Sequence, residues 1–362
     1  MKAAEKAMQG KDAGQAAEKT TDARTALEEA VTAGKEKLER LRSATDLKGL
    51  KEDQDSTKKD TDGIADRMKE PPPLVPPSPE GGVPGQSEVK NASQDMQGAS
   101  QNLGQNQAGK ASRSQKKALD NLEAGREKTE ETLEELQRAF RDRLLSYLRE
   151  KFTKMLNEQR LVTKETKSLD LKLRALKAAL PPGSTAEPEP DRKDRQLAES
   201  LAARESGIVT LADDVIDVLS EDGTTLVFPG VVQEVKEDIV NVSGLLSRIQ
   251  TGERTQYIQR EIEVAIEEIL KALEMAQKSP PPPNPSQGRQ SKSGAGPLLP
   301  LSTELKLVRA LQLRVNQRTK DFDLGRKPEA DLAPEDKLQV NAIAKKQKEV
   351  EELLRKLGEQ AR

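Results

Sequence analysis

The strongest structural signal in the sequence lies in residues 133–180, which run LEELQRAFRDRLLSYLREKFTKMLNEQRLVTKETKSLDLKLRALKAAL. Apolar residues recur here with a period close to 3.6, that of a straight α-helix, at Leu133, Leu136, Phe140, Leu144, Leu148, Phe152, Met155, Val162, Leu169, Leu173, Leu176 and Leu180. No proline or glycine occurs between Arg126 and Pro181. The pattern predicts one long amphipathic helix, which needs partner helices because it cannot bury its apolar stripe alone.

The downstream sequence supplies such partners. Three amphipathic helices are predicted within residues 191–278, and their apolar stripes begin at Leu197, Val231 and Ile258. Short connections between rod-like helices favour antiparallel neighbours. We therefore predict an all-α fold in which long amphipathic helices form an antiparallel helical bundle or coiled coil.

Proline-rich and glycine-rich stretches at residues 70–85, 181–190 and 279–297 divide the chain, because proline cannot continue a helix. The sequence predicts a weakly anchored helical segment over 1–69 and a disordered linker over 70–115. It then predicts the long helix with its antiparallel bundle over 116–278, a Pro-rich linker over 279–300 and a helical hairpin over 301–360. The linkers, rich in Pro, Gln and Gly, are expected to be disordered.

Large apolar side chains are distributed unevenly along the chain. Residues 1–118 contain 12 Leu, Ile, Val and Phe side chains, whereas residues 119–362 contain 64. Burial of such side chains is the main stabilising contribution to a fold. We therefore expect a packed core only in the second part.

The composition excludes several classes of function. The 362 residues include no His and no Cys, which rules out imidazole and thiolate chemistry and the usual structural zinc sites. The formal net charge of -2 gives no electrostatic drive toward nucleic acid. The sequence contains no Walker loop, dinucleotide fingerprint, nucleophile elbow or calcium loop.

Charge is also distributed unevenly. Residues 138–177 carry 12 basic and 5 acidic side chains, a net of +7, whereas residues 206–274 carry 14 acidic and 5 basic ones, a net of -9. Exposed ion pairs contribute at most about 1 kcal/mol each, so this complementarity would set orientation more than stability. We expect the basic helix to lie along the acidic ones.

Three aromatic residues, Phe140, Tyr147 and Phe152, are interleaved with basic residues in the segment 137–154. This arrangement could contact a membrane surface or nucleic acid. The alternative is that the aromatics belong to the apolar stripe and the bases to its flanks. We favour this alternative, because an acidic partner segment is present in the same chain.

The connector DGTTLVFPG, residues 222–230, is apolar and ends in proline. As a recognition loop it would present Phe228 to a ligand. As a structural feature, Phe228 would fill the end of the bundle, and Pro229 would set the first turn of the next helix. We favour the structural role.

A basic cluster surrounds an apolar seam in residues 308–322 and includes Arg314, Asn316 and Arg318. It could bind an anionic group, and Asn316 near a core position could fix helix register. A solvated face is the interpretation we favour. No catalytic, metal-binding or cofactor-binding residue is predicted.

The order of three segments carries a resemblance: LLSYLREKFTKMLNEQRLVTKET at residues 144–166, EDGTTLVFPG and the helices after it at 221–277, and LPLSTELKLVRALQLRVNQRTKDF at 299–322. Over about residues 130–325 the chain resembles an uncharacterised family of long helical proteins from planctomycete-type bacteria. The resemblance implies no chemistry and no site residue. Members of such families often carry a signal segment before the helices.

The leading hypothesis is a non-enzymatic helical scaffold or protein-protein interaction protein that acts through amphipathic helix association. Its partners would be other proteins or further copies of the chain, with no nucleic acid, cofactor or small-molecule ligand. The alternative is an envelope-associated or membrane-surface protein that binds anionic lipid through the basic helix 138–177. The N-terminal stretch MKAAEKAMQG has no secretory apolar core, which predicts a cytoplasmic protein, or a periplasmic or envelope one if a signal segment precedes it.

Overall fold

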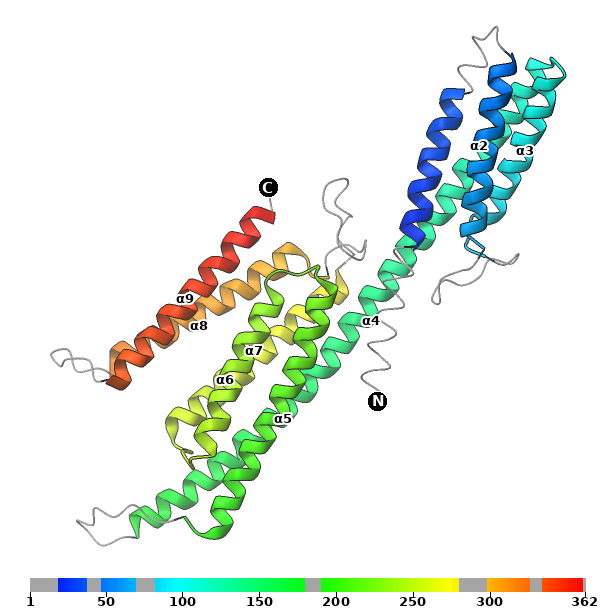
Figure 1. Cartoon of the computed structure of the whole chain (residues 1–362). Coiled ribbons are helices and arrows are strands. Elements are labelled where there is room, and N and C mark those ends of the chain that lie inside the picture. The colour runs from blue at the N-terminus through cyan, green and yellow to red at the C-terminus, as the bar shows by residue number, and fades with distance from the viewer. Residues whose placement is uncertain are drawn as a thin grey trace. The chain divides into compact units, whose positions relative to one another are not determined.

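The computed structural model describes residues 19–37, 47–69, 82–179, 190–279, 298–325 and 334–360. Within these ranges the chain is almost entirely helical and contains no strand (Figure 1). After a helix over residues 19–37, the helices are α2 (Leu47–Arg67), α3 (Gln86–Gly104), α4 (Ala108–Ala178), α5 (Arg192–Asp222), α6 (Phe228–Leu246), α7 (Glu253–Lys278), α8 (Leu301–Gly325) and α9 (Pro334–Gln360). The prediction of an all-α fold is confirmed.

The helices belong to two compact units. The first consists of Met1–Arg141 with Ser286–Ala295, and the second of Asp142–Pro285 with Gly296–Arg362. The boundary falls inside α4, a helix of 71 residues, so the predicted domain boundary at residue 116 does not coincide with it. Helix α4 begins at Ala108, earlier than the predicted boundary at 116, and includes both Gly109 and Gly125.

The first unit has a core that the sequence analysis did not predict. The helix over 19–37, α2, α3 and the N-terminal part of α4 enclose a buried cluster of Leu27, Val31, Ile64, Ala65, Met68, Val83, Val89, Ala92, Met96, Ala118 and Leu122. Three of these side chains are alanines and two are methionines, which a count of Leu, Ile, Val and Phe leaves out. Leu27 and Val31 are almost fully buried, which contradicts a weakly anchored N-terminal segment.

The prediction of a disordered linker over 70–115 is wrong for residues 82–115. These residues form a short turn, α3 and the start of α4, while residues 70–81 lie outside the described part. Polar side chains of α3 make specific buried contacts that compensate for their lack of apolar surface. Gln86 Nε2 donates to the carbonyl of Ala65 at 2.8 Å, and Ser93 donates to Asp62.

A close approach of two backbones fixes the turn before α3. Gly85 adopts a φ of 97°, a left-handed conformation that favours glycine. A Cβ atom placed on Gly85 would lie 2.6 Å from the carbonyl oxygen of Gly125 in α4. Glycine is therefore required at position 85 by its backbone conformation and by the available space.

We expect Gly85→Ala to lower the free energy of unfolding of the first unit by about 2 kcal/mol or more, because it adds a clash to left-handed strain. Urea denaturation followed by circular dichroism measures this. Gly63→Ala is the matched control: Gly63 lies in α2, a Cβ there meets nothing within 4 Å, and we expect stabilisation of about 0.5–1 kcal/mol. Equal effects of the two substitutions would contradict the close approach.

In the second unit the C-terminal part of α4 lies with α5, α6 and α7 (Figure 1). Helix α5 packs against α6, and α6 packs against α7. Helix α8 contacts α7 and also α9. The buried residues follow the predicted stripes: Leu148, Phe152, Met155 and Val162 on α4, Leu201, Ile208, Val215 and Leu219 on α5, Val231, Val235, Ile239 and Val242 on α6, and Ile262, Ile266, Ile269 and Leu273 on α7.

Local signals set the ends of these helices. The Asp191 side chain accepts a hydrogen bond from the backbone N–H of Asp194 at 2.7 Å and caps α5, and Gly223 ends α5 in a left-handed conformation. Pro229 lies in the first turn of α6, where its missing N–H costs nothing.

The predicted Pro-rich linker over 279–300 is wrong at its C-terminal end. Leu298 and Leu299 are only 2% and 1% exposed, and the backbone N–H of Leu298 donates to Thr224 Oγ1 at 3.0 Å. Glu304 Oε1 accepts from the backbone N–H of Leu226 at 3.1 Å. The start of α8 is therefore fastened to the connector between α5 and α6, while residues 280–297 lie outside the described part.

Ion pairs confirm that the basic helix lies along the acidic ones. Lys151 of α4 contacts Asp214 of α5 at 2.6 Å, and Arg160 of α4 contacts Glu267 of α7 at 2.6 Å. Arg204 reverses this arrangement: it is a basic residue on α5, and it pairs with Glu158 and Glu165 of α4.

Candidate functional site

The described residues contain no group of three or more His, Cys, Asp or Glu side chains placed to hold a metal ion. Two features combine burial with polar chemistry: a cavity in the first unit and a layer of polar side chains in the core of the second. A third, a network of ion pairs, fastens the last two helices of the second unit.

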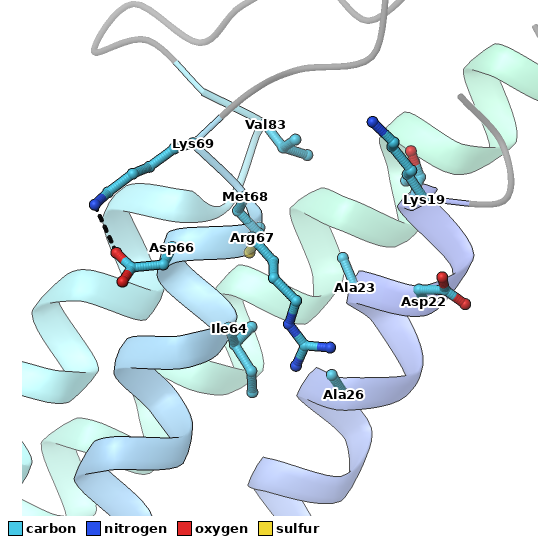
Figure 2. Close-up of a pocket in the computed structure, with 11 residues that line it drawn as sticks. Lys19, Asp22, Ala23, Ala26, Ile64, Asp66, Arg67, Met68, Lys69 and Val83 are labelled. Carbon is cyan, nitrogen blue, oxygen red and sulfur yellow. Dashed lines mark ion pairs between the residues drawn. The ribbon is translucent and has the colours of Figure 1, made fainter. Parts of the chain in front are cut away.

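The cavity in the first unit has a volume of about 410 Å³ and lies between the helix over 19–37 and the end of α2 (Figure 2). Its apolar lining comes from Ala23, Ala26, Ile64, Met68 and Val83. The charged side chains around it are Lys19, Asp22, Asp66, Arg67 and Lys69, of which Asp66 and Lys69 pair with each other at 2.6 Å. These charged side chains include no nucleophile activated by a base. The lining resembles the charged surface at the end of a helix more than a reactive site.

The polar layer lies where α4, α5 and α7 meet. Glu205 of α5 is fully buried, and its Oε1 accepts hydrogen bonds from Gln159 Nε2 of α4 at 2.9 Å and from Gln259 Nε2 of α7 at 3.3 Å. Gln259 Nε2 also donates to Thr166 Oγ1 of α4 at 3.1 Å. Gln159, Gln259 and Thr166 are also fully buried. Three helices are thus joined by one carboxyl group.

Burial has the largest effect on the pKa of the Glu205 carboxyl group. It raises the pKa of Glu205 from 4.5 to about 7, although the two glutamine amides and the nearby Arg204 act in the opposite direction. The negative charge of Glu263 raises the pKa further. The second unit therefore contains a core carboxyl that titrates near neutrality.

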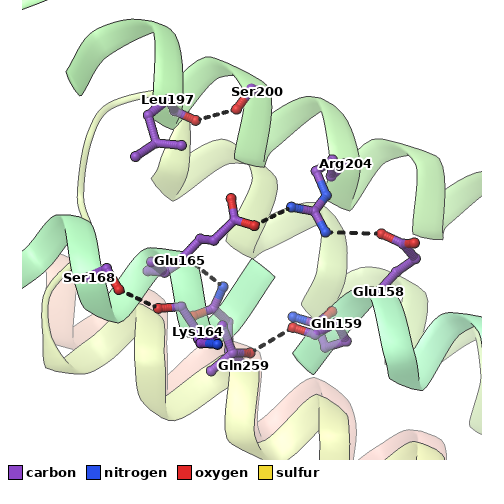
Figure 3. Close-up of polar contacts among 11 residues, drawn as sticks. Glu158, Gln159, Lys164, Glu165, Ser168, Leu197, Ser200, Arg204 and Gln259 are labelled. Atoms are coloured by element: carbon purple, nitrogen blue, oxygen red, sulfur yellow. Dashed lines mark hydrogen bonds and ion pairs between the residues drawn. The ribbon is translucent and has the colours of Figure 1, made fainter. Parts of the chain in front are cut away.

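Arg204 closes the polar layer on its solvent side. Its guanidinium donates to Glu165 Oε1 at 2.9 Å and to Glu158 Oε2 at 3.1 Å (Figure 3). Both carboxylates belong to α4, so the arginine ties α5 to α4 beside the buried glutamate. Its charge is thereby directed to Glu158 and Glu165.

These residues were not predicted, although the sequence contains a signal for them. The predicted stripe of α4 steps from Met155 to Val162 and on to Leu169, and a polar residue takes the intermediate helix turn each time. Gln159 and Thr166 fill those positions, and Glu205 fills the corresponding gap between Leu201 and Ile208 on α5. Polar residues at stripe positions are the signal of a buried polar layer.

The predicted aromatic candidates take different places. Phe152 and Phe228 are fully buried and stack, with ring centroids 6.0 Å apart and an interplanar angle of 25°. Phe228 therefore packs against α4 and is not presented to solvent. Tyr147 is half-buried with Lys151 Nζ 5.4 Å from its ring centre, and Phe140 is half-buried near the end of the first unit.

Two of the predicted basic residues belong to the ion-pair network. Arg318 pairs with Asp238 of α6, and Lys346 of α9 lies 3.4 Å from the same carboxylate and 3.8 Å from Glu234. Arg314 lies 3.7 Å from Glu268 of α7. The side chains of Arg314 and Arg318 are only 10% and 19% exposed, so the expectation of a solvated face is wrong for them.

The network brings charges of both signs together. Burial raises the pKa values of Glu234 and Glu261, and the positive charges of Arg314 and Arg318 counteract this rise. Tyr257 of α7 donates its hydroxyl to Asp321 of α8 at 2.8 Å. Acidic side chains of α6 and α7 thus compensate the positive charges of Arg314 and Arg318, and the network holds α8 and α9 in place.

Asn316 does not lie at a core position. Its side chain is exposed and accepts a hydrogen bond from Gln312 Nε2 at 2.9 Å on its own helix. The amides of Gln312 and Gln347 instead bond reciprocally between α8 and α9, at 2.8 and 3.0 Å. The exposed position of Asn316 agrees with the favoured interpretation of a solvated face, and the alternative role in helix register is not supported.

Among the described helices, none is both long and apolar enough to cross a membrane. Comparison with known proteins finds no matching family model, no matching curated protein and no matching solved structure. The resemblance to a bacterial family of long helical proteins therefore stays a prediction.

Proposed function

We propose that this protein is a non-enzymatic helical scaffold that acts by associating amphipathic helices, arranged as an antiparallel bundle or coiled coil. The observation that carries the proposal is the layer of Gln159, Glu205 and Gln259, in which buried polar side chains join three helices. Such layers contribute little net stability but select the register and partners of helices. They suit a protein whose task is specific helix pairing.

Exposed apolar side chains support a docking role. Leu161 and Leu171 of α4 are 47% and 68% exposed, and Leu301, Leu305 and Leu313 of α8 are similarly accessible. Exposed apolar side chains on one helix face, such as Leu301 and Leu305 four residues apart, are suited to contact with a further helix. Partners would be other proteins or additional copies of the chain.

Light scattering during size-exclusion chromatography tests association directly. We expect Leu171→Glu to weaken self-association by about tenfold or more, because it places a charge in an apolar contact, while helicity by circular dichroism stays unchanged. Ser168→Glu is the control, since Ser168 is exposed on the same helix and receives the same charge. A wild-type chain that stays monomeric at every concentration would contradict self-association.

Binding of anionic lipid through residues 138–177 is the second proposal, and it has less support. Several of the bases concerned are engaged within the second unit: Lys151 with Asp214, Arg160 with Glu267, and Lys172 with Asp194. Lipid would have to compete with these carboxylates. Co-sedimentation with anionic vesicles at low and high salt tests it, and binding that salt abolishes would support it.

A further inference from the structure

We propose that Glu205 is a proton-operated switch, which packs α4, α5 and α7 tightly when its carboxyl is neutral and loosens them when it is ionised. The proposal concerns control of the second unit by pH and holds whether or not the protein acts as a scaffold. The amides of Gln159 and Gln259 both donate to Oε1 of Glu205, so this oxygen accepts two hydrogen bonds.

The remaining amide and carboxyl oxygens of the layer lack hydrogen-bond donors. Glu205 Oε2, Gln159 Oε1 and Gln259 Oε1 are buried, and the structure gives none of them a hydrogen-bond donor. A buried acceptor without a donor costs about 1–3 kcal/mol, and more when it carries charge. The layer as it stands thus has an excess of acceptors.

A proton on Glu205 reduces this excess. Binding a proton from solvent turns Oε2 into an O–H donor and removes the buried charge in the same step. Turning either glutamine amide around cannot do this, because it only exchanges an acceptor for a donor within one side chain. The neutral acid is therefore the form that the packed interface accommodates.

The neighbouring charges do not replace the proton. Arg204, on the same helix as Glu205, is directed to Glu158 and Glu165 of α4 at 3.1 and 2.9 Å. From α7, Glu263 contributes a negative charge, which opposes ionisation of Glu205. Burial outweighs the attraction of Arg204 and raises the pKa of Glu205 to about 7.

The sign of the effect follows from linkage. Because the pKa of Glu205 is higher in the folded protein than the ordinary value of 4.5, the folded state binds more protons between these two values. The stabilisation by Glu205 is complete below about pH 4.5 and is lost as the pH rises to about 7. Each unit of pKa difference is a tenfold change in the unfolding equilibrium, so the loss is on the order of a hundredfold.

Hydrogen exchange of the full chain between about pH 5 and about pH 8 tests the switch. After correction for intrinsic exchange, we expect the protection of α5 and α7 amides in the wild type to fall on the order of a hundredfold relative to Glu205→Gln. The substitution keeps the shape and supplies a permanent N–H donor. Glu199→Gln, at an exposed position of α5, is the control and should retain the wild-type pH profile.

Parallel pH profiles of the wild type and Glu205→Gln would overturn the proposal. If Glu205→Gln fails to fold, infrared spectroscopy of the wild type replaces it, since a neutral carboxyl absorbs apart from carboxylates. A protonated carboxyl that ionises near pH 7 supports the switch, and full ionisation of all carboxyls by about pH 6 overturns it. Neither readout depends on self-association, so failure of the scaffold proposal would be recognised separately.

Discussion

Phe228→Ala is expected to lower the free energy of unfolding of the second unit by about 3–5 kcal/mol, the range for truncating a buried phenylalanine. Phe228 is fully buried at the start of α6 and stacks on Phe152 of α4. Removing its ring leaves a cavity between these helices and exposes one face of Phe152. Urea denaturation followed by circular dichroism measures the loss.

Leu226→Ala is the matched control, because Leu226 belongs to the same connector and is 39% exposed. We expect it to cost less than about 1 kcal/mol. A double-mutant cycle of Phe152→Ala with Phe228→Ala should give a coupling of about 0.5–1.5 kcal/mol for the ring pair. Equal losses for Leu226→Ala and Phe228→Ala would show that the ring is not a packing centre.

Arg318→Met should have the next largest effect, a loss of about 2–3 kcal/mol in the second unit. The substitution keeps the apolar stem of the side chain and removes the charge that faces Asp238, which is 12% exposed. Removing one partner of a largely buried pair leaves the other charge with less compensation, here that of Lys346 at 3.4 Å. Thermal denaturation at neutral pH measures the effect.

The pH dependence of this loss distinguishes charge from packing. Arg318 lowers the pKa values of Glu234 and Glu261, so its removal raises them and costs most when these carboxyls are ionised. The loss should therefore shrink as the pH falls through the raised pKa values of Glu234 and Glu261, which lie above the ordinary value of 4.5. Lys320→Met, at an exposed position two residues further along α8, is the control and should be nearly neutral. A loss independent of pH would contradict the ionic explanation.

The sequence predicted the helices of the second unit well, because the spacing of large aliphatics reports the buried face of a helix. It failed for the first unit, where the core includes Ala65, Ala92 and Ala118 beside a few larger apolar side chains. Alanine occurs on buried and exposed helix faces alike, so its position carries little information about packing. The prediction of disorder for α3 was wrong for another reason: the segment is rich in Gln, Asn, Ser and Gly, and the sequence does not show that its polar side chains make buried contacts such as that of Gln86 with Ala65.

The candidate site was predicted only in part. Arg314 and Arg318 were identified by charge, but their burial depends on carboxylates of α6 and α7 that are remote in sequence. Arg318 and Asp238, for example, are separated by 80 positions. A basic cluster has the same appearance in the sequence whether water or a folded acidic helix faces it.

The sequence by itself determined that this chain is helical and which face of each major helix in the second unit is apolar. Both properties are local, since they arise from hydrogen bonds four residues apart and from a period of about 3.6 residues. Only the tertiary structure decided which helices meet, and so placed Glu205 between Gln159 and Gln259, respectively 46 and 54 positions away. The environment of a buried carboxyl depends on such distant neighbours, and so does its affinity for a proton.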